Sequence, residues 1–192
     1  MRNFNYSITT TILFGKNKIE VIIPEIKKYG SRVLLCYGGG SIKKIGIYDK
    51  LLALFKENSV YFVELAGIKP NPRVSSVREG IALCREHKLD FILAVGGGSV
   101  IDASKAIAAG VPYEGDVWDF MIGKATVVDP LPLASVLTLA ATGSEMNGSA
   151  VISNDETQDK RPMGDPALRP VFSVLDPEYT YSVNKWHSAA GT

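Results

Sequence analysis

The chain has 192 residues, a length that suits one domain of ordinary size with a short trailing segment. Its 21 lysines and arginines nearly balance its 20 aspartates and glutamates, so the net charge of +1 provides no field that would attract nucleic acid or an anionic membrane. The amino-terminal segment lacks a basic region followed by an apolar core, and no apolar run approaches the roughly 20 residues that a bilayer crossing needs. We therefore expect a soluble, cytoplasmic protein with no nucleic-acid and no membrane partner.

Strand-like and helical segments alternate along the first half of the chain. Strands are predicted at 32–37, 60–65 and 91–95, and helices at 42–55, 74–87 and 100–109. Within 74–84 the apolar residues lie three and four positions apart, the spacing of a helix that packs one face on a sheet. The first and third strands are almost entirely apolar, as expected where helices cover both faces. The alternation predicts an α/β fold with a Rossmann-like, doubly wound, mostly parallel sheet.

The second half of the chain is less regular. A short helix is predicted at 116–122, strands at 133–139 and 171–176, and a hairpin over 150–163 that turns at 154–159. Asp176 followed by Pro177 is typical of a helix cap with proline in the first turn. We place a dinucleotide-binding domain at 1–180 and the start of a second, helical domain at 181–192, and we expect the chain to stop inside an element.

The two cysteines, Cys36 and Cys84, lie in apolar stretches and form no CxxC pair or other metal-ligand spacing. We interpret both as buried thiols without a redox role.

A first glycine cluster, Gly96-Gly97-Gly98-Ser99, follows a buried strand and opens a helix. Glycines allow the backbone to approach a ligand closely, and the free N–H groups and dipole of a helix start favour an anion such as a pyrophosphate. The alternative is a tight turn that needs positive φ, for which one glycine would suffice.

A second cluster, 38–41 (GGGS), also lies between a strand and a helix, so it belongs to the same carboxyl edge of a parallel sheet. NAD sites commonly place an acidic residue at the end of this strand, and none is present here. Ser41 can donate a hydrogen bond, and Lys43 and Lys44 follow it, although a solvated helix face would also explain the lysines. This pattern favours a 2′-phosphate, and hence NADP(H) over NAD. Neither cluster is a GxGxxG fingerprint, so the pair alone indicates only a nucleotide.

Two longer motifs, GGGSVIDASK at 96–105 and TLAATGSEMN at 138–147, resemble those of the iron-containing (group III) alcohol dehydrogenases. The segments NFNY, ILFGK, YGGGSIKK, GIKPNP and VLDPEYTY resemble the butanol dehydrogenase and NADPH-dependent aldehyde reductase branch of that family. The resemblance covers essentially the whole chain and implies the amino-terminal, dehydroquinate synthase-like domain.

Carried over residue by residue, the resemblance implies a set of cofactor contacts but no catalytic residue. It assigns Gly39 and Ser41 to the 2′-phosphate, Asn71 to the wall around the adenine and its ribose, Gly97, Gly98 and Ser99 to the pyrophosphate, Asp102, Thr138, Leu139, Thr142, Ser144 and Asn147 to the nicotinamide side, Lys160 to the nicotinamide ribose, and Tyr179 to closure of the cleft. Two alternatives remain open. Asp102 and Lys105 also fit a solvated helix pair, and 138–147 also fits a mere connecting loop.

The resemblance also implies a metal. In the family a helical second domain binds Fe²⁺ or Zn²⁺ through one Asp and three His, and the first two of these lie in a pattern similar to A-x-G-x-x-D-x-x-x-H. This sequence has Ala189-Ala190-Gly191-Thr192 and then ends, so we expect every metal ligand to be absent. His87 and His187 do not replace the missing ligands.

The implied function is the NADP(H)-binding half of an enzyme that interconverts primary alcohols and aldehydes by hydride transfer, in which the metal polarises the carbonyl oxygen. We expect the 192 residues alone to be inactive and to form a homodimer. Two alternatives stay open: a nucleotide-binding or assembly module without catalysis, and a glycerol dehydrogenase relative.

Overall fold

The computed structural model describes residues 8–181 together with 183, 186 and 189. A six-stranded sheet with the order β1-β8-β5-β4-β2-β3 forms the centre, and all its neighbouring strands are parallel. These strands are β1 (Thr11–Phe14), β2 (Arg32–Tyr37), β3 (Tyr61–Leu65), β4 (Phe91–Gly96), β5 (Leu133–Leu137) and β8 (Phe172–Leu175), and a separate antiparallel pair comprises β6 (Ser149–Asn154) and β7 (Asp159–Gly164). The expected α/β fold with a mostly parallel sheet is confirmed.

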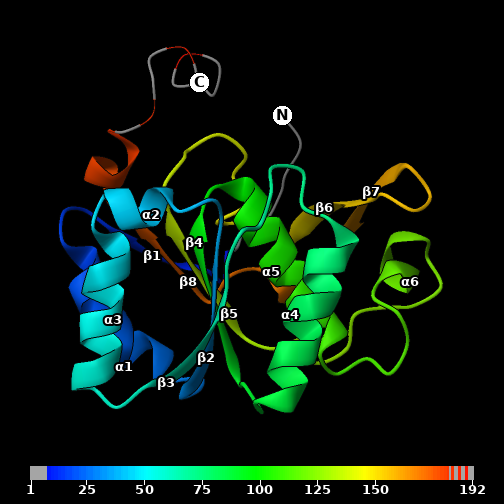
Figure 1. The fold of residues 1–192 in the computed structure, drawn as a ribbon, viewed down its shortest axis with the longest axis horizontal. Coiled ribbons are helices and arrows are strands. Elements are labelled where there is room, and N and C mark those ends of the chain that lie inside the picture. The colour runs from blue at the N-terminus through cyan, green and yellow to red at the C-terminus, as the bar shows by residue number, and fades with distance from the viewer. Residues whose placement is uncertain (1–7, 182, 184–185, 187–188, 190–192) are drawn as a thin grey trace, which may run out of the picture.

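Helices cover both faces of the sheet. They are α1 (Ile22–Ile26), α2 (Ser41–Lys44), α3 (Ile47–Glu57), α4 (Val74–Glu86), α5 (Gly98–Gly110) and α6 (Trp118–Met121), with 3₁₀ helices at Lys18–Val21, Pro166–Leu168 and Pro177–Thr180. Figure 1 shows α1 and α3 on one side of the sheet and α4 and α5 on the other. None of the helices in the described part of the chain has the length and apolar character needed to span a membrane.

Side-chain alternation along the strands divides the core into two apolar layers. In β2, Val33 and Leu35 pack toward α1 and α3, whereas Leu34 and Cys36 pack toward α4 and α5. All four of these side chains are fully buried. The near-continuous apolar sequence of β2 is therefore explained by helices on both faces.

The order of the strands places a topological switch point between β2 and β4. From β2 the chain passes to β3 on one side, and then returns through α4 to β4 on the other side of β2. The crevice outside the carboxyl ends of two such strands is where open α/β sheets bind their ligands. Both glycine clusters follow these two strands.

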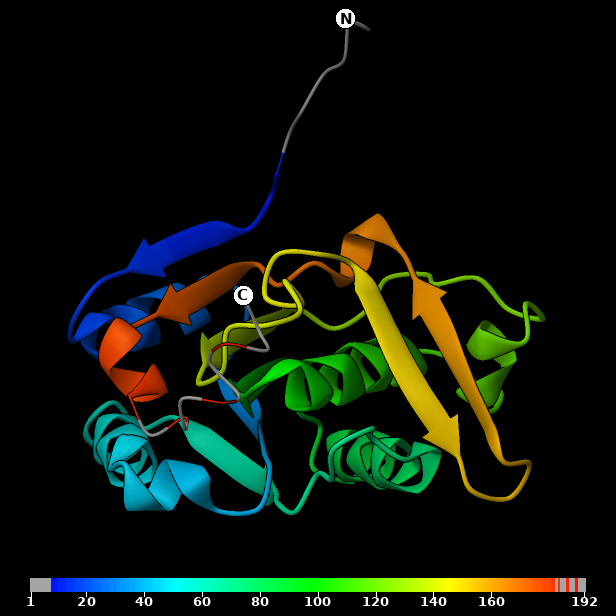
Figure 2. The same ribbon diagram turned by 90° about the horizontal axis from the view of Figure 1, so that it is seen from above.

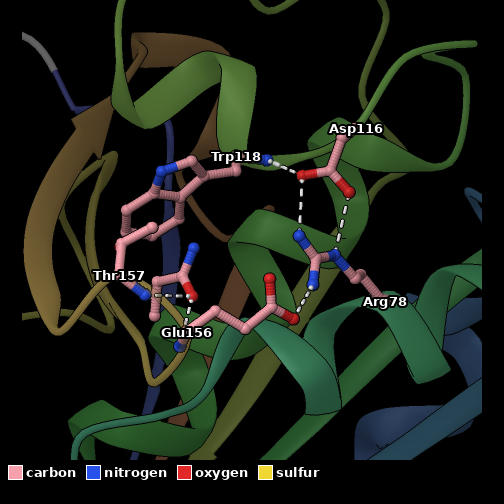
Figure 3. A network of polar contacts seen from close by, with 6 residues as sticks. Arg78, Asp116, Trp118, Glu156 and Thr157 are labelled. Atoms are coloured by element: carbon pink, nitrogen blue, oxygen red, sulfur yellow. Dashed lines mark hydrogen bonds and ion pairs between the residues drawn. The ribbon is translucent and has the colours of Figure 1, made fainter.

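The β6–β7 hairpin lies outside the sheet and packs along α5 (Figure 2). Its tip is joined to the helices by Arg78 of α4, whose guanidinium contacts Asp116 at 2.8 Å and Glu156 at 3.3 Å (Figure 3). Asp116 in turn accepts a hydrogen bond from the backbone N–H of Trp118 at the start of α6. One side chain thus fixes the hairpin, α4 and the loop before α6 relative to one another.

Most predicted elements are present, with three differences. The helix predicted at 42–55 is two helices, because Gly46 adopts φ +78° and separates α2 from α3. Strand β1 and helix α1 were not predicted at all. The hairpin turn and the Asp176 cap are confirmed, since the Asp176 side chain accepts from the backbone N–H of Glu178 at 3.0 Å. The trailing segment predicted at 181–192 lies largely outside the described residues.

Candidate functional site

The glycines of the turn between β4 and α5 allow neighbouring side chains to pack closely against the backbone. None of Gly96, Gly97 and Gly98 has positive φ, so the tight-turn alternative is wrong for this cluster. A Cβ on Gly96 would lie 2.6 Å from Val100 Cγ2, and one on Gly98 would lie 2.5 Å from Thr142 Oγ1. The turn therefore brings bare backbone to the start of α5, where the first N–H groups of a 13-residue helix have no intrahelical acceptor.

The turn between β2 and α2 differs in its geometry. Gly40 has φ +97°, which favours glycine, and a Cβ on Gly38 would lie 3.3 Å from the Ile68 carbonyl oxygen. Gly39 is exposed, and a Cβ placed on it meets nothing within 4 Å. The helix that follows is a single turn, so this cluster offers open space and the Ser41 hydroxyl rather than a long helix dipole.

A cavity of about 370 Å³ lies between the two turns. The predicted site residues that line it are Gly39, Ser41, Gly97, Gly98, Ser99, Thr138 and Leu139. No charged side chain is among the described residues that line this cavity. Its position at the switch point, with the start of α5 in its wall, suits a ligand that carries an anionic group.

A larger cavity, of about 620 Å³, lies elsewhere, between the end of α5 and the loops around α6. It is lined by side chains such as Tyr113, Phe120 and Lys124 and by no residue of either glycine cluster. We assign the ligand site to the smaller cavity because that cavity alone, of these two, combines a helix start, glycine backbone and the switch point.

The loop 138–147 covers the first glycine turn. Leu139 Cβ lies 3.3 Å from the position that a Cβ on Gly97 would take, and Thr142 packs against Gly98 in the same way. This segment therefore contributes Thr138 and Leu139 to the wall of the cavity, and its cofactor contacts stay a prediction.

Asp102, Ser144 and Asn147 do not line the cavity but form a polar cluster around a lysine. The Lys105 ammonium donates to Ser144 Oγ at 2.9 Å, to Asn147 Oδ1 at 2.9 Å and to the Ser149 carbonyl oxygen at 2.8 Å. The Ser144 hydroxyl donates to Asp102 Oδ1 at 2.6 Å. Because Lys105 is 0% exposed, the alternative of a solvated Asp102–Lys105 pair is wrong. Burial lowers the pKa of Lys105 to about 8, against the opposing effect of Asp102 and Glu145.

The remaining predicted residues are Asn71, Lys160 and Tyr179. Lys160 Nζ donates to Asn71 Oδ1 at 2.7 Å, so these two residues join the hairpin to the loop before α4. Tyr179 is half-buried against the core layer of α1 and α3, and burial raises its pKa to about 12. None of the three is among the residues that line the cavity.

Of the two lysines near the second turn, Lys43 lies over a pair of tyrosine rings. Lys43 Nζ lies 4.4 Å from the centre of the Tyr48 ring and 5.4 Å from that of Tyr37. Both tyrosine hydroxyls donate to the Glu64 carboxylate, at 2.8 and 2.5 Å. Lys43 is thus attracted to an aromatic pair that carries a carboxylate, although Lys43 and Lys44 are both exposed.

Within the described residues, no group of three or more His, Cys, Asp or Glu side chains could hold a metal ion. These residues therefore do not fit the iron or zinc implied by the resemblance. Among the described residues after position 180, only Val183 lines the cavity between the two glycine turns.

Sequence reasoning assigned no role of its own to Lys105, although it is the centre of the polar network. Its signal was present: Lys105 is the only charged residue in the stretch 103–113, which is otherwise rich in alanine and other small or apolar residues. A lysine in such a stretch is buried if helices and strands cover every side of it.

The sequence model of the iron-containing alcohol dehydrogenase family matches residues 9–177, and the chain belongs to that family. NADH-dependent butanol dehydrogenase A of Clostridium acetobutylicum is 58% identical over 192 residues, which are 100% of this chain and 49% of that protein. The NADPH-dependent aldehyde reductase YqhD of Escherichia coli is 44% identical over 95% of this chain and 47% of its own length. The chain thus spans about half the length of the curated relatives that it matches.

A crystal structure of NADH-dependent butanol dehydrogenase A from Thermotoga maritima superposes with a TM-score of 0.95 at 44% identity, over 100% of this chain and 48% of that one. The predicted family and its amino-terminal α/β fold are confirmed.

Proposed function

We propose that this chain binds a nicotinamide dinucleotide across its two glycine turns and is the cofactor half of an alcohol dehydrogenase. The observation that carries the proposal is the cavity of about 370 Å³ at the switch point, which is lined by both clusters. Family membership narrows the choice of ligand to nicotinamide dinucleotides, because the names of the relatives include NADH or NADPH.

The residues present fit such a cofactor. Gly98 and Ser99 line the cavity at the start of α5, where free backbone N–H groups and the helix dipole favour a pyrophosphate. The open space at Gly39 and the Ser41 hydroxyl receive the adenosine end, and Thr138 and Leu139 wall the nicotinamide end. The cofactor supplies or accepts the hydride, and these residues bind and orient it.

The reaction that we propose for the whole protein is the interconversion of a primary alcohol and an aldehyde. It rests on family membership and on the names of the relatives, which are butanol dehydrogenases and an aldehyde reductase. The iron or zinc of the family would have to be held by residues outside those described. We expect the 192 residues alone to show negligible activity, and butanal reduction by a pure preparation would contradict this.

The form of the cofactor has two candidates. NADP(H) is the sequence-based prediction, and it is favoured by a cavity lining without a carboxylate that would repel a 2′-phosphate. NAD(H) is favoured by the name of the relative with 58% identity.

Calorimetric titration of the purified chain with NADPH and with NADH, after removal of adventitious metal by chelation, tests both points. Binding of either cofactor supports the proposed site, and the ratio of the two dissociation constants selects between NADP(H) and NAD(H). If the chain binds neither NADPH nor NADH, the proposal is contradicted.

A glycerol dehydrogenase relative and a non-catalytic nucleotide-binding or assembly module are the other candidates. Glycerol oxidation by the whole protein in preference to butanol oxidation would favour the first. Tight dinucleotide binding by a whole protein that turns over neither alcohol would favour the second. We also propose a homodimer, which light scattering of the purified chain would test.

A further inference from the structure

The buried cation of the structure lies next to the proposed cofactor site. Lys105 is 0% exposed, and all three N–H bonds of its ammonium group are used, on a hydroxyl, an amide oxygen and a carbonyl oxygen. A buried lysine is costly unless it is fully hydrogen-bonded and its charge is balanced. Such an arrangement in the middle of an apolar helix indicates a specific task.

The acceptors of Lys105 all come from one segment. Ser144, Asn147 and Ser149 belong to the end of the loop that starts at Thr138 and to the first residue of β6. The earlier part of the loop packs on the glycine turn, with Leu139 against Gly97 and Thr142 against Gly98. Lys105 therefore joins the helix that begins at the pyrophosphate position to the loop that walls the cavity.

The charge of Lys105 is balanced by two carboxylates. Asp102, on its own helix, is reached through the Ser144 hydroxyl, and its second oxygen accepts from the backbone N–H of Val151 at 3.0 Å. Glu145, on the loop, also interacts with Lys105 through its charge, and its Oε2 atom is buried without a hydrogen bond from any described residue. Without the ammonium, this cluster would present two uncompensated negative charges, one of which, Asp102, lies only about 6 Å along α5 from Gly98.

We propose that Lys105 is a positioning residue for the cofactor: its ammonium holds the loop 142–149 against the glycine turn and balances the carboxylates beside the pyrophosphate position. The inference rests on the proposed dinucleotide site. Asp102, Ser144 and Asn147 then act through this network, and contact with the nicotinamide is not needed to explain their presence.

The protonation state of Lys105 provides a readout that a merely structural residue would not move. Burial brings its pKa to about 8, and the charged groups that face it are Asp102 and Glu145. A neutral amine has only two N–H donors for its three acceptors and no charge for the carboxylates. Dinucleotide affinity should therefore fall as the pH rises through 8, whereas the contribution of Lys105 to the stability of the fold should rise between about pH 8 and the pKa of 10.5 of an unfolded lysine.

The test measures the dissociation constant of NADH at pH 7 and pH 9 for the unsubstituted protein, Lys105→Met and Lys105→Arg. NADH is the probe because its pyrophosphate keeps its charge over this range. We expect the unsubstituted protein to bind NADH about fivefold more weakly at pH 9 than at pH 7. Lys105→Met should bind NADH about tenfold more weakly than the unsubstituted protein at pH 7, with the same affinity at both pH values. The affinity of Lys105→Arg for NADH should also be independent of pH. Lys56→Met, an exposed lysine of α3, is the matched control and should behave as the unsubstituted protein.

Equal affinity of Lys105→Met and the unsubstituted protein, or parallel pH profiles of the two, would overturn the proposal. If Lys105→Met does not fold by circular dichroism, the pH profiles of the unsubstituted protein and Lys105→Arg decide: a fall in the first without a fall in the second supports the role.

Amide hydrogen exchange of the ligand-free protein separates this inference from the proposed function. Faster exchange confined to 142–151 in a Lys105 variant supports the hold on the loop, and unchanged exchange there overturns it. Failure of the unsubstituted protein to bind NADH or NADPH at any pH would instead contradict the proposed function, and with it the cofactor role of Lys105.

Discussion

Substitution of Gly39 by aspartate tests where the adenosine end of the cofactor lies. Gly39 does not have positive φ, and a Cβ on it meets nothing within 4 Å, so the new side chain fits without strain. It adds a carboxylate to a cavity whose described lining residues carry no charge. A 2′-phosphate in this position would be repelled, whereas a ribose 2′-OH would gain a hydrogen-bond acceptor.

The size of the effect follows from the charges. Two unit charges about 5 Å apart interact by about 3 kcal/mol at an effective dielectric constant of about 20, and salt reduces this to about 1 to 2 kcal/mol at a solvent-facing site. NADPH affinity should therefore fall about fivefold to thirtyfold, while NADH affinity rises by about twofold to tenfold through the new hydrogen bond.

Calorimetry with both cofactors at low and moderate salt measures these changes. Gly39→Asn is the matched control, since it has the same shape without the charge and should leave NADPH binding within about threefold of the original. An unchanged ratio of NADPH to NADH affinity in Gly39→Asp would refute the placement of the 2′-position beside Gly39.

Three further predictions concern the scaffold. Gly80→Ala should lower the free energy of unfolding by about 1 to 2 kcal/mol in urea, because its Cβ would lie 2.9 Å from Ile107 Cγ1 in the contact between α4 and α5, and Gly39→Ala should change it by less than about 0.5 kcal/mol. The pKa of Asp116 is held below its usual range chiefly by the hydrogen bond from Arg78. The pair therefore stabilises the fold at pH values above the pKa that Asp116 has in the unfolded chain, and this stability is lost as the pH falls through the lower pKa of the folded state. Arg78→Ala should lower the free energy of unfolding at pH 7 by less than about 1 kcal/mol and make it less dependent on pH in the acid range. Both cysteines are buried and burial raises their pKa values, so a thiol reagent should label the folded protein at pH 8 far more slowly than the chain in urea, and equal rates would contradict the packing of the core.

The central strands and the glycine turns were predictable because their signals are local. An apolar run followed by glycines and a serine specifies a buried strand, a turn and a helix start without reference to the rest of the chain. Strand β1 was not predictable in this way. It has only four residues, none fully buried, and it is specified by its pairing with β8, from Thr11 with Phe172 to Phe14 with Leu175.

The break between α2 and α3 depends on a conformation that the sequence does not reveal. An isolated glycine inside a helical pattern is tolerated in a continuous helix, and only φ +78° at Gly46 shows that the helix ends here.

The polar network around Lys105 was beyond a local pattern for a different reason. Along α5, Asp102 and Lys105 have the spacing of a surface pair. The burial of Lys105 results from a loop and a hairpin that follow about 40 residues later; Lys105 and Ser144, for example, are 39 residues apart. The resemblance assigned Asp102, Ser144 and Asn147 to the nicotinamide side, which stays a prediction, and the sequence analysis gave Lys105 no role of its own.

The most direct test of the account is to map the amide resonances of the labelled chain that shift when NADH is added. Joint shifts at 38–41 and 97–99, the residues of the two glycine turns, are the result predicted for one dinucleotide that spans both. Binding with shifts at the larger cavity around Tyr113 and Phe120, and none at the glycine turns, would contradict the assignment of the site.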